Sequence, residues 1–372
     1  MSYISKPKVI HPAMKRNKLG LTLRDYEGSM STLCAGCGHD SITAAIVQSF
    51  FELSIPHHRV AKLSGIGCSS KTPTYFLGAS HGFNSAHGRM PAIASGAAAA
   101  NRDLIYIGVS GDGDSLSIGL GQMAHAIRRN LDMIYVLENN GVYGLTKGQF
   151  SASADVGSKS KKGDANTQTP LDPVLLGLAL GASFIARGFS GDKKQLIPLL
   201  KAGIAHKGFA LIDILSPCVT FNDHEGSTKS YVSTRKNQVE VLRADYVAAG
   251  EDDEEEGDVS EELPSDFVPL TRSITVDYEE GTTRTVTMHD GSQVRFTKGP
   301  KDYDPHSREK VFAYLTERQE RGEVPTGLLY LDERMAEMHE QARTVDKPLT
   351  EVAFDKLCPG SAALAEIMAA YR

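Results

Sequence analysis

Two short motifs place oxygen ligands at a spacing that could bind a metal ion. The sequence GDGD occupies positions 111–114, and 25 residues separate Gly113 from the pair Asn139-Asn140. The Asp112 carboxylate and the Asn140 side-chain carbonyl are oxygen types that Mg²⁺ prefers when it also holds a diphosphate. The glycines allow a ligand to approach the backbone closely. Asp-Gly is also ordinary turn chemistry, so the pairing of the two motifs, and not either one alone, predicts a magnesium–diphosphate site.

Four of the five cysteines are spaced for shared chemistry. Cys34 and Cys37 form a C-x-x-C pair. Cys68 and Cys218 each follow a predicted strand, and Cys358 stands apart. In a reducing compartment this pattern indicates a metal or iron–sulfur site rather than disulfides. Spacing alone does not distinguish a four-cysteine zinc site from a [4Fe–4S] cluster.

These residues need elements that bring them together. Apolar runs at 104–109 and 133–137 enclose the GDGD loop and a helical pattern, which predicts strand, loop, helix and strand. The helical pattern places four apolar residues roughly on one face: Ile118, Met123, Ile127 and Leu131. Further strands are predicted at 59–64 and 210–215. Four strands would then end just before Cys68, Asp112, Asn140 and Cys218. Since parallel strands bind ligands at their carboxyl ends, the sequence predicts an α/β fold with a doubly wound parallel sheet and one active site at that edge.

Helices are predicted between these strands. The first is expected at 41–53, with Asp40 or Ser41 as its N-cap. Three others are expected at 90–101, 172–180 and 192–206. Helices on both sides of a parallel sheet are what a doubly wound fold requires.

Two polar loops carry further candidates. The sequence His87-Gly88-Arg89 precedes a helix and is placed to meet an anionic substrate or a pyrimidine ring, although a lone histidine is more often a surface or structural residue. The segment 150–170 is predicted to be a mobile loop over the same edge of the sheet. Its lysines could contact an acidic electron carrier or a phosphorylated substrate, or simply aid solubility: Lys159, Lys161 and Lys162.

The composition divides the chain into four segments. Residues 1–32 are predicted to be an extended arm, and 33–236 the cofactor-binding domain. Residues 237–306 are predicted to be an acidic linker with a β insertion, and 307–372 a mostly helical end.

Local patterns refine the last two segments. A helix is predicted at 238–249, nine carboxylates lie within 251–262, and period-two alternation over 273–298 predicts a small antiparallel meander with turns at 280–281 and 290–291. The acidic stretch is expected to be solvated, with a docking surface as the alternative. The end of the chain is predicted to contain a helix at 307–321, a strand at 328–331 and a helix at 361–372.

The composition also limits which cellular compartment and which partners we expect. The 372 residues are 41% hydrophobic, contain no tryptophan and carry a formal net charge of −6. No run approaches the roughly 20 apolar residues that span a bilayer, and the N-terminus lacks the apolar core of a secretory signal. We therefore expect a cytoplasmic protein with reduced thiols and with neither a nucleic-acid nor a membrane partner.

Seven motifs together resemble one enzyme family. They are CAGCGH (34–39), GIGCS (65–69), HGR (87–89), GDGD with IG (111–119), RRN (128–130), NNGVYGLTKGQ (139–149) and SPCVTFN (216–222). GDG followed by NN resembles the diphosphate-binding motif of thiamine diphosphate enzymes. The whole set resembles the β subunit of 2-oxoacid:ferredoxin oxidoreductases, of the 2-oxoglutarate type, and implies the diphosphate-type domain of the thiamine diphosphate-binding fold. Two features depart from the family: Ala35 stands where a proline is usual, and the 250–300 region has no counterpart in compact β subunits.

The resemblance implies a set of ligands and contacts. A [4Fe–4S] cluster would be held by Cys34, Cys37, Cys68 and Cys218. Mg²⁺ would be bound by Asp112, Asn140 and the carbonyl of Val142. Thiamine diphosphate would contact Ile66, Gly67, Cys68, Ser69, Gly113, Asp114, Gly144, Leu145 and His39. The catalytic residues would be Lys147, His87 and Arg89, with Lys147 near the substrate carboxylate or coenzyme A.

The resemblance also implies a reaction and its partners. A 2-oxo acid joined to thiamine diphosphate loses CO₂ and leaves a strongly reducing enamine, so a one-electron acceptor nearby would give the thiols a purpose and favours the cluster over zinc. Coenzyme A would be the co-substrate, and ferredoxin would receive the electrons. The chain has room for one such α/β domain, so an α subunit, in an α₂β₂ assembly, would supply the pyrimidine-binding domain and the activating glutamate.

Three alternatives remain open at the level of sequence. The substrate could be pyruvate or a branched 2-oxo acid instead of 2-oxoglutarate. The chain could be a redox-free thiamine diphosphate decarboxylase subunit with a structural zinc. In that enzyme the four thiols would have no role in electron transfer. It could also be a non-catalytic, zinc-stabilised binding protein, which leaves Asp112 and Asn140 unused.

Overall fold

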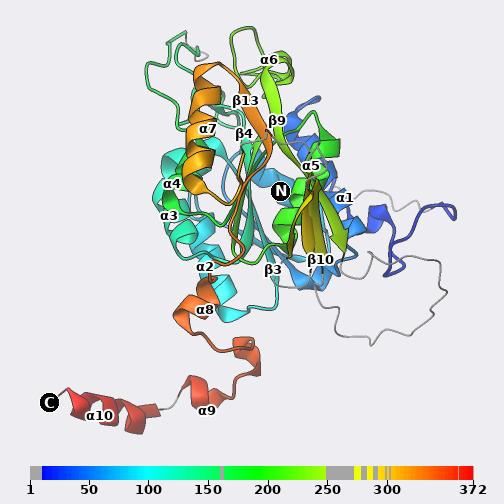
Figure 1. Cartoon of the computed structure of the whole chain (residues 1–372). Coiled ribbons are helices and arrows are strands. Elements are labelled where there is room, and N and C mark those ends of the chain that lie inside the picture. The colour runs from blue at the N-terminus through cyan, green and yellow to red at the C-terminus, as the bar shows by residue number, and fades with distance from the viewer. Residues whose placement is uncertain are drawn as a thin grey trace.

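The fold is built on one large mixed sheet. The computed structural model describes residues 11–159, 163–248, 272–277, 283–287, 292–297, 300, 303–358 and 360–371. Eleven strands of this part of the chain form the sheet in the order β10-β11-β12-β9-β13-β7-β8-β4-β3-β1-β2 (Figure 1). The order is not sequential, so the chain crosses over the sheet repeatedly.

Six neighbouring strands of the sheet are parallel. They are β2 (His81–Asn84), β1 (Val60–Ser64), β3 (Ile105–Gly111), β4 (Met133–Asn139), β8 (Phe209–Leu215) and β7 (Phe184–Phe189). β4, β7 and β8 are buried along their whole length. Such continuous burial requires cover on both faces of a parallel sheet.

Helices cover both faces of the sheet. On one face α1 (Gly38–Glu52) packs against α5 (Lys193–Ala205). On the other face a row of helices contacts one another in turn (Figure 1): α2 (Met90–Ala100), α3 (Leu120–Arg128), α4 (Pro173–Leu180) and α7 (Arg308–Glu320). The predicted doubly wound α/β fold is therefore confirmed.

The sheet continues into the predicted β insertion. β10 (Arg272–Asp277), β11 (Thr283–Thr287) and β12 (Gln293–Thr297) form the expected antiparallel meander, whose two turns lie outside the described residues, as does the acidic stretch. The meander joins the main sheet through β9 (Gln238–Ala248), which pairs with β13 (Val324–Leu331). β13 runs antiparallel to β7.

The helix predicted at 238–249 is wrong. A short helix, α6 (Tyr231–Asn237), ends there, and β9 follows. Buried Leu242 and Ala244 flank exposed Arg243, which is the period of a strand. The pairing with β12 and β13 decides the conformation of a segment whose sequence also allowed a helix.

Two helix boundaries also differ from the predictions. α1 begins at Gly38, with Cys37 as its N-cap, and not at residue 41. A Cβ at residue 38 would lie 2.6 Å from Ser216 Oγ, so glycine lets the first turn of the helix lie directly against the end of β8. After the GDGD loop, Gly113–Ile118 forms a π-helix, and Ile118 is 50% exposed and is not on the buried face as predicted. The wider turn moves the side chain towards solvent.

The N-terminal segment is not wholly an extended arm. A 3₁₀ turn at Leu23–Tyr26 packs on the core, where Tyr26 is completely buried and its hydroxyl donates to the Ile55 carbonyl at 3.0 Å. The first ten residues lie outside the described part of the chain.

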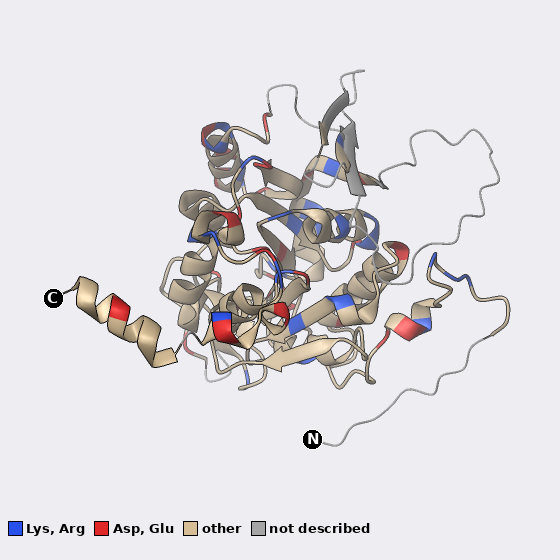
Figure 2. Ribbon diagram, turned by 90° about the horizontal axis from the view of Figure 1, so that it is seen from below, with Lys and Arg blue, Asp and Glu red and all other residues tan. Residues whose placement is uncertain are grey.

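The C-terminal segment leads away from the sheet. Beyond β13, α8 (Met338–Ala342) is followed by α9 (Phe354–Leu357) and α10 (Gly360–Ala370), which extend from the body of the molecule (Figure 1). Few charged residues mark α10 (Figure 2), and its apolar side chains Leu364, Ile367 and Met368 are more than half exposed. Within the described residues no helix has the length and apolar character to cross a membrane.

Candidate functional site

Four neighbouring strand ends carry the predicted site residues. In the sheet order β8-β4-β3-β1, these strands are followed by Cys218, Asn140, Asp112 and Cys68. The expected convergence on one edge of the sheet is therefore present. The parallel strands place all four loops at their carboxyl ends, where folds of this kind bind ligands.

The two carboxylate oxygens of Asp112 differ in their partners. Oδ2 accepts hydrogen bonds from the Gly141 amide at 2.9 Å, from Ser153 Oγ at 2.5 Å and from Ser151 Oγ. Oδ1 has one long contact, 3.5 Å from the Asn140 amide. The side chain is almost fully buried. Three donors therefore fix the carboxylate through Oδ2, while Oδ1 keeps only this long contact.

Asn140 is fixed by its own turn. Its Oδ1 accepts from the Val142 amide at 3.0 Å, and its backbone carbonyl accepts from Asn222 Nδ2 at 2.8 Å. Gly141 has a φ of 77°, and a Cβ there would lie 2.6 Å from Asn222 Nδ2, so the turn requires glycine. The turn brings the amides of Asn140 and Gly141 to Asp112, and Val142 follows them directly in the chain.

A small hairpin presents the next three predicted residues. β5 (Val142–Tyr143) pairs with β6 (Gln149–Phe150), and the connection between them contains Gly144, Leu145 and Lys147. Leu145 is 48% exposed, and Lys147 is exposed with a φ of 82°. A non-glycine residue in the left-handed region is uncommon and marks a backbone held by its surroundings.

Asp114 ties three loops together. Its Oδ1 accepts from the Gly88 amide at 2.7 Å and from the Ile66 amide at 3.3 Å, and its Oδ2 accepts from Ser110 Oγ at 2.6 Å. His87 Nδ1 lies against the same carboxylate. The sequence predicted Asp114 as a cofactor contact. In the structure its carboxylate is occupied in holding the loops that carry Ile66 and His87.

His87 and Arg89 of the HGR motif are more exposed to solvent than Gly88. His87 is about one-third exposed, and its ring lies edge-on to Tyr143 with centroids 6.0 Å apart. Arg89 is exposed at the N-terminus of α2. The structure thus brings His87 to the hairpin that contains Gly144, whereas within the described part of the chain no hydrogen bond or ion pair fixes the Arg89 guanidinium there.

The four cysteines line one cavity. This cavity, of about 180 Å³, is lined by Cys34, Cys37, Cys68 and Cys218 together with residues of the neighbouring loops, among them His39, Lys71, Asn140, Gly144 and Leu145. All five cysteines of the chain are free thiols, and Cys358 is exposed far along the chain. Among the described residues, no three His, Cys, Asp or Glu side chains converge closely enough to bind a single metal ion.

Burial raises the pKa values of three of the thiols that line the cavity. It raises the pKa of Cys37 to about 12, with further repulsion from Glu138 and Cys218. Burial also raises the pKa values of Cys68 and Cys218. Without a metal these groups are neutral thiols, and a bound metal or cluster would replace their protons.

One buried polar residue of the site, Glu138, was not among the residues predicted from the sequence. Glu138 is completely buried at the end of β4, and burial, with repulsion from Asp40, raises its pKa well above the ordinary value. Its Oε2 lies 3.3 Å from Nδ1 of His39, whose pKa burial lowers to about 4. The His39 imidazole is therefore neutral near pH 7. Glu138 directly follows the apolar run 133–137, and a carboxylate at the end of a buried strand was the available signal.

The loop at 150–170 is better anchored than predicted. Ser151, Ser153 and Ala154 are buried, and Asp155 accepts from Thr228 Oγ1 at 2.6 Å and pairs with Lys229 at 3.2 Å. The first part of the loop therefore belongs to the site. Lys159 is exposed, and Lys161 and Lys162 lie outside the described residues.

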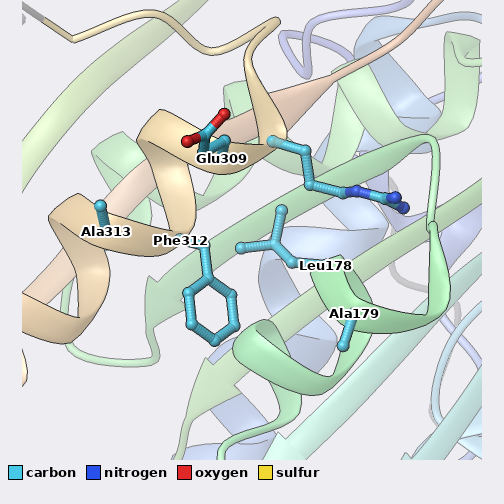
Figure 3. Close-up of a pocket in the computed structure, with 6 residues that line it drawn as sticks. Leu178, Ala179, Glu309, Phe312 and Ala313 are labelled. Atoms are coloured by element: carbon cyan, nitrogen blue, oxygen red, sulfur yellow. The ribbon is translucent and has the colours of Figure 1, made fainter.

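A second cavity lies away from this edge. It has a volume of about 420 Å³ and lies between α4 and α7, where Leu178 and Phe312 point into the same space (Figure 3). Its lining is mainly apolar and contains none of the predicted site residues.

The comparisons with known proteins agree with this geometry. Residues 65–214, which include Cys68, Asp112 and Asn140, match the family described as "Thiamine pyrophosphate enzyme, C-terminal TPP binding domain". The fold and the diphosphate-type loops thus define a thiamine diphosphate-binding domain.

Curated relatives define the family more closely. The chain is 43% identical over 210 residues to a 2-oxoacid:ferredoxin oxidoreductase subunit beta from a Sulfolobus species, which covers 56% of this chain and 68% of the relative. It is 40% identical to the 2-oxoglutarate oxidoreductase subunit KorB of Mycobacterium tuberculosis, over 57% of this chain and 58% of that one. It is 34% identical to the 2-oxoglutarate synthase subunit KorB of Methanocaldococcus jannaschii, over 57% and 76%. The chain belongs to the family of 2-oxoacid:ferredoxin oxidoreductase β subunits.

A solved structure matches nearly the whole chain. It is a 2-oxoglutarate:ferredoxin oxidoreductase from Magnetococcus marinus with 2-oxoglutarate, coenzyme A and succinyl-CoA bound. The TM-score is 0.69 at 27% identity, and the match covers 97% of this chain and 98% of that one. The curated sequence matches are shorter and span 58–76% of those three relatives.

Proposed function

We propose that this chain is the β subunit of a 2-oxoglutarate:ferredoxin oxidoreductase. The reaction would convert 2-oxoglutarate and coenzyme A to succinyl-CoA and CO₂, with two electrons leaving one at a time to ferredoxin. One observation carries the proposal: Asn140 and Gly144 belong to the oxygen-ligand loops and also line the cavity of the four cysteines. The thiamine diphosphate site, where the 2-oxo acid would lose CO₂, and the cluster that accepts the electrons would therefore be direct neighbours.

The oxygen ligands fit Mg²⁺ and a diphosphate. Asp112 Oδ1, the Asn140 side chain and the Val142 carbonyl would bind the ion, and the GDGD and GIGCS loops, with Gly144 and Leu145, would hold thiamine diphosphate. His39 would contact the cofactor through its position beside Asn140. When bound, thiamine diphosphate supplies the carbanion that makes loss of CO₂ from a 2-oxo acid possible.

The cysteine cavity fits a [4Fe–4S] cluster better than zinc. A structural zinc needs four sulfurs about 2.3 Å from one point. Here the four thiols line the walls of a cavity of about 180 Å³, and no three ligand side chains among the described residues converge on one metal position. A cluster is larger than one ion and is held from several sides by thiolates. This difference favours the redox enzyme over the redox-free decarboxylase subunit.

The substrate proposal rests on charge as well as on the relatives. Two of the relatives and the solved structure are named for 2-oxoglutarate. Lys71 lines the cysteine cavity, and its ammonium group could pair with the second carboxylate of 2-oxoglutarate, which pyruvate and branched 2-oxo acids lack. Lys147, His87 and Arg89 are proposed to meet the substrate or coenzyme A at the reacting centre.

A partner chain is required by this proposal. The name "subunit beta" of the relatives implies an α subunit. We propose that it supplies the pyrimidine-binding domain and the activating glutamate in an α₂β₂ assembly, because the described residues form one domain of this type. Five free thiols fit a reducing cytoplasm.

Substrate screening tests the proposal. The α–β complex, purified without oxygen, is assayed for viologen reduction with 2-oxoglutarate, pyruvate and a branched 2-oxo acid, each with and without coenzyme A. We expect reduction that depends on coenzyme A and is fastest with 2-oxoglutarate. Viologen reduction with another acid would change the substrate, and decarboxylation without reduction would favour the redox-free enzyme.

A further inference from the structure

An ion triad with two buried members, Arg187 and Asp213, is linked by hydrogen bonds to the candidate magnesium site. Arg187 on β7 donates through Nη2 to both oxygens of Asp172, each at 2.7 Å, and through Nε to Asp213 Oδ2 at 2.7 Å. Arg187 is 5% exposed, and Asp213 is completely buried on β8. Buried ion pairs are often no more stabilising than apolar residues of the same size, so their presence needs a reason other than stability.

The triad fixes the direction of a neighbouring amide. Asn139 Nδ2 donates to Asp213 Oδ1 at 3.0 Å. A flipped amide would place its carbonyl oxygen against the carboxylate, so Asp213 determines that Asn139 presents Oδ1 to the other side. Arg187 holds Asp213 in the orientation that makes this contact.

The amide in turn places a hydroxyl on Asp112. Ser153 Oγ lies 2.8 Å from Asn139 Oδ1 and 2.5 Å from Asp112 Oδ2, and its one proton serves these two acceptors. The path from Arg187 to Asp112 therefore consists of consecutive hydrogen bonds between buried groups. Its outer end reaches α7, because Gln319 Nε2 donates to Asp172.

We propose that Arg187, Asp213, Asn139 and Ser153 form a chain of positioning residues that sets the Asp112 carboxylate for metal binding. The inference rests on the proposed function, since it assumes that Asp112 binds Mg²⁺. None of the four residues would touch the ion. They hold Asp112 through Oδ2 and so leave Oδ1 directed towards the cation. Loss of hydrogen-bonding partners behind a metal ligand typically lowers metal affinity 10–100-fold.

The last link is tested by a matched set of serine variants. Binding of thiamine diphosphate to the intact α–β complex is measured by calorimetry over a series of Mg²⁺ concentrations. We expect Ser153→Ala to raise the Mg²⁺ concentration for half-maximal binding about tenfold or more. Ser153→Thr, which keeps the hydroxyl, is expected to restore most of the affinity. Ser49→Ala is the control, because Ser49 is equally buried but bonds only to backbone carbonyls of helices.

The far links are tested by Arg187→Lys and Asp213→Asn. Lysine keeps the charge but cannot bridge both carboxylates, and we expect each variant to raise the Mg²⁺ requirement several-fold. Each variant is also combined with Ser153→Ala. The double variants should raise the Mg²⁺ requirement by less than the product of the two single effects, because both substitutions act through the same row of hydrogen bonds. Should either variant fail to fold, the serine series and the other variant still decide the matter.

The outcomes separate the two proposals. A wild-type complex that shows no Mg²⁺-dependent thiamine diphosphate binding contradicts the proposed function itself, and the positioning chain with it. A wild-type complex that binds normally, with folded variants that keep its Mg²⁺ requirement, overturns only the positioning chain. An effect of Ser153→Ala without any effect of Arg187→Lys or Asp213→Asn overturns it as well, because the influence would then end at Ser153.

Discussion

Asp112 uses its two oxygens for different tasks. Oδ2 accepts three hydrogen bonds from Gly141, Ser151 and Ser153, while Oδ1 has only the long contact with Asn140. The sequence identified the carboxylate as a candidate ligand, but the two serine donors come from the 150–170 loop, which was predicted to be polar and mobile. Serines in such a loop carry no pattern that distinguishes buried donors from solvated ones.

Removal of this carboxylate should abolish cofactor binding without unfolding the chain. We expect Asp112→Ala to eliminate detectable Mg²⁺-dependent binding of thiamine diphosphate, because the only charged oxygen ligand is lost. Calorimetry measures binding, and circular dichroism checks the fold. Asp103→Ala, at an exposed aspartate on a distant turn, serves as the control. Undiminished affinity in Asp112→Ala would remove the metal site from this edge.

The cysteine assignments divide the five thiols into two groups. Cys218 lines the cavity and Cys358 is exposed elsewhere. We expect Cys218→Ser to lose most of the bound iron and Cys358→Ser to keep all of it, as measured by iron and sulfide analysis after anaerobic purification. Loss of iron in Cys358→Ser would mean that the wrong fourth ligand had been assigned.

Lys71 offers a test of substrate charge. If its ammonium group binds the second carboxylate of 2-oxoglutarate, Lys71→Met should lower kcat/KM for 2-oxoglutarate about 10-fold or more and leave pyruvate nearly unaffected, because charged hydrogen bonds contribute about 1.5–3 kcal/mol. Steady-state viologen reduction with both acids measures the ratio. Lys159→Met, at an exposed lysine outside the cavity, is the control. An equal loss with both acids would exclude this role in substrate choice.

At the scale of elements, the parallel strands and their loops followed from local sequence. Continuous apolar runs predicted β1, β3, β4 and β8, and each ends within two residues of its predicted limit. What local sequence could not predict were features fixed by distant partners. β9 is a strand because β12 and β13 pair with it, and α1 starts early because Gly38 fits against Ser216. The π-helix after Asp112 likewise has no short-range signal.

Asp132, in the turn between α3 and β4, is expected to make the free energy of unfolding depend on pH. Burial raises the pKa of Asp132 from 3.8 to about 6, although the Gly208 amide donates to it at 3.1 Å, and Glu337 adds repulsion. The folded protein thus keeps a proton that the unfolded chain has released, so the free energy of unfolding falls as the pH rises from about 4 to 6. Above pH 6 Asp132 is charged in both the folded and the unfolded chain, and the full destabilisation by its charge remains.

Asp132→Asn should remove this cost, since asparagine keeps an acceptor for the Gly208 amide. We expect the variant to raise the free energy of unfolding by about 1–2 kcal/mol at pH 8, a figure reduced because the side chain is partly exposed, and to change it little near pH 4. Denaturant unfolding at both pH values measures the difference. A benefit at pH 4 equal to that at pH 8 would contradict the titration of Asp132.

At the scale of the whole molecule, one sheet edge collects the site while other surfaces remain uncovered. α9 and α10 extend from the body with exposed Phe354, Ile367 and Tyr371 (Figure 1). The sequence predicted one helix here, at 361–372, but nothing in it indicated that α9 and α10 would leave the core. Membership in a family of β subunits indicates a second chain, which the fold alone does not show.

The chain by itself should therefore be inactive. We expect the isolated chain to give no 2-oxoglutarate-dependent viologen reduction, because the pyrimidine side of thiamine diphosphate would have no protein contacts. Addition of the separately prepared α subunit should restore the activity, with a rate that saturates at one α per β. Activity of the isolated chain would contradict a divided active site.

Iron and sulfide content tests the central claim most directly. The chain is co-expressed with its α subunit, purified without oxygen and analysed for iron, zinc and acid-labile sulfide. The proposed cluster predicts about four iron and four sulfide per chain and no zinc, with Cys34, Cys37, Cys68 and Cys218 as ligands. One zinc and no sulfide would contradict the oxidoreductase and leave a thiamine diphosphate enzyme without electron transfer.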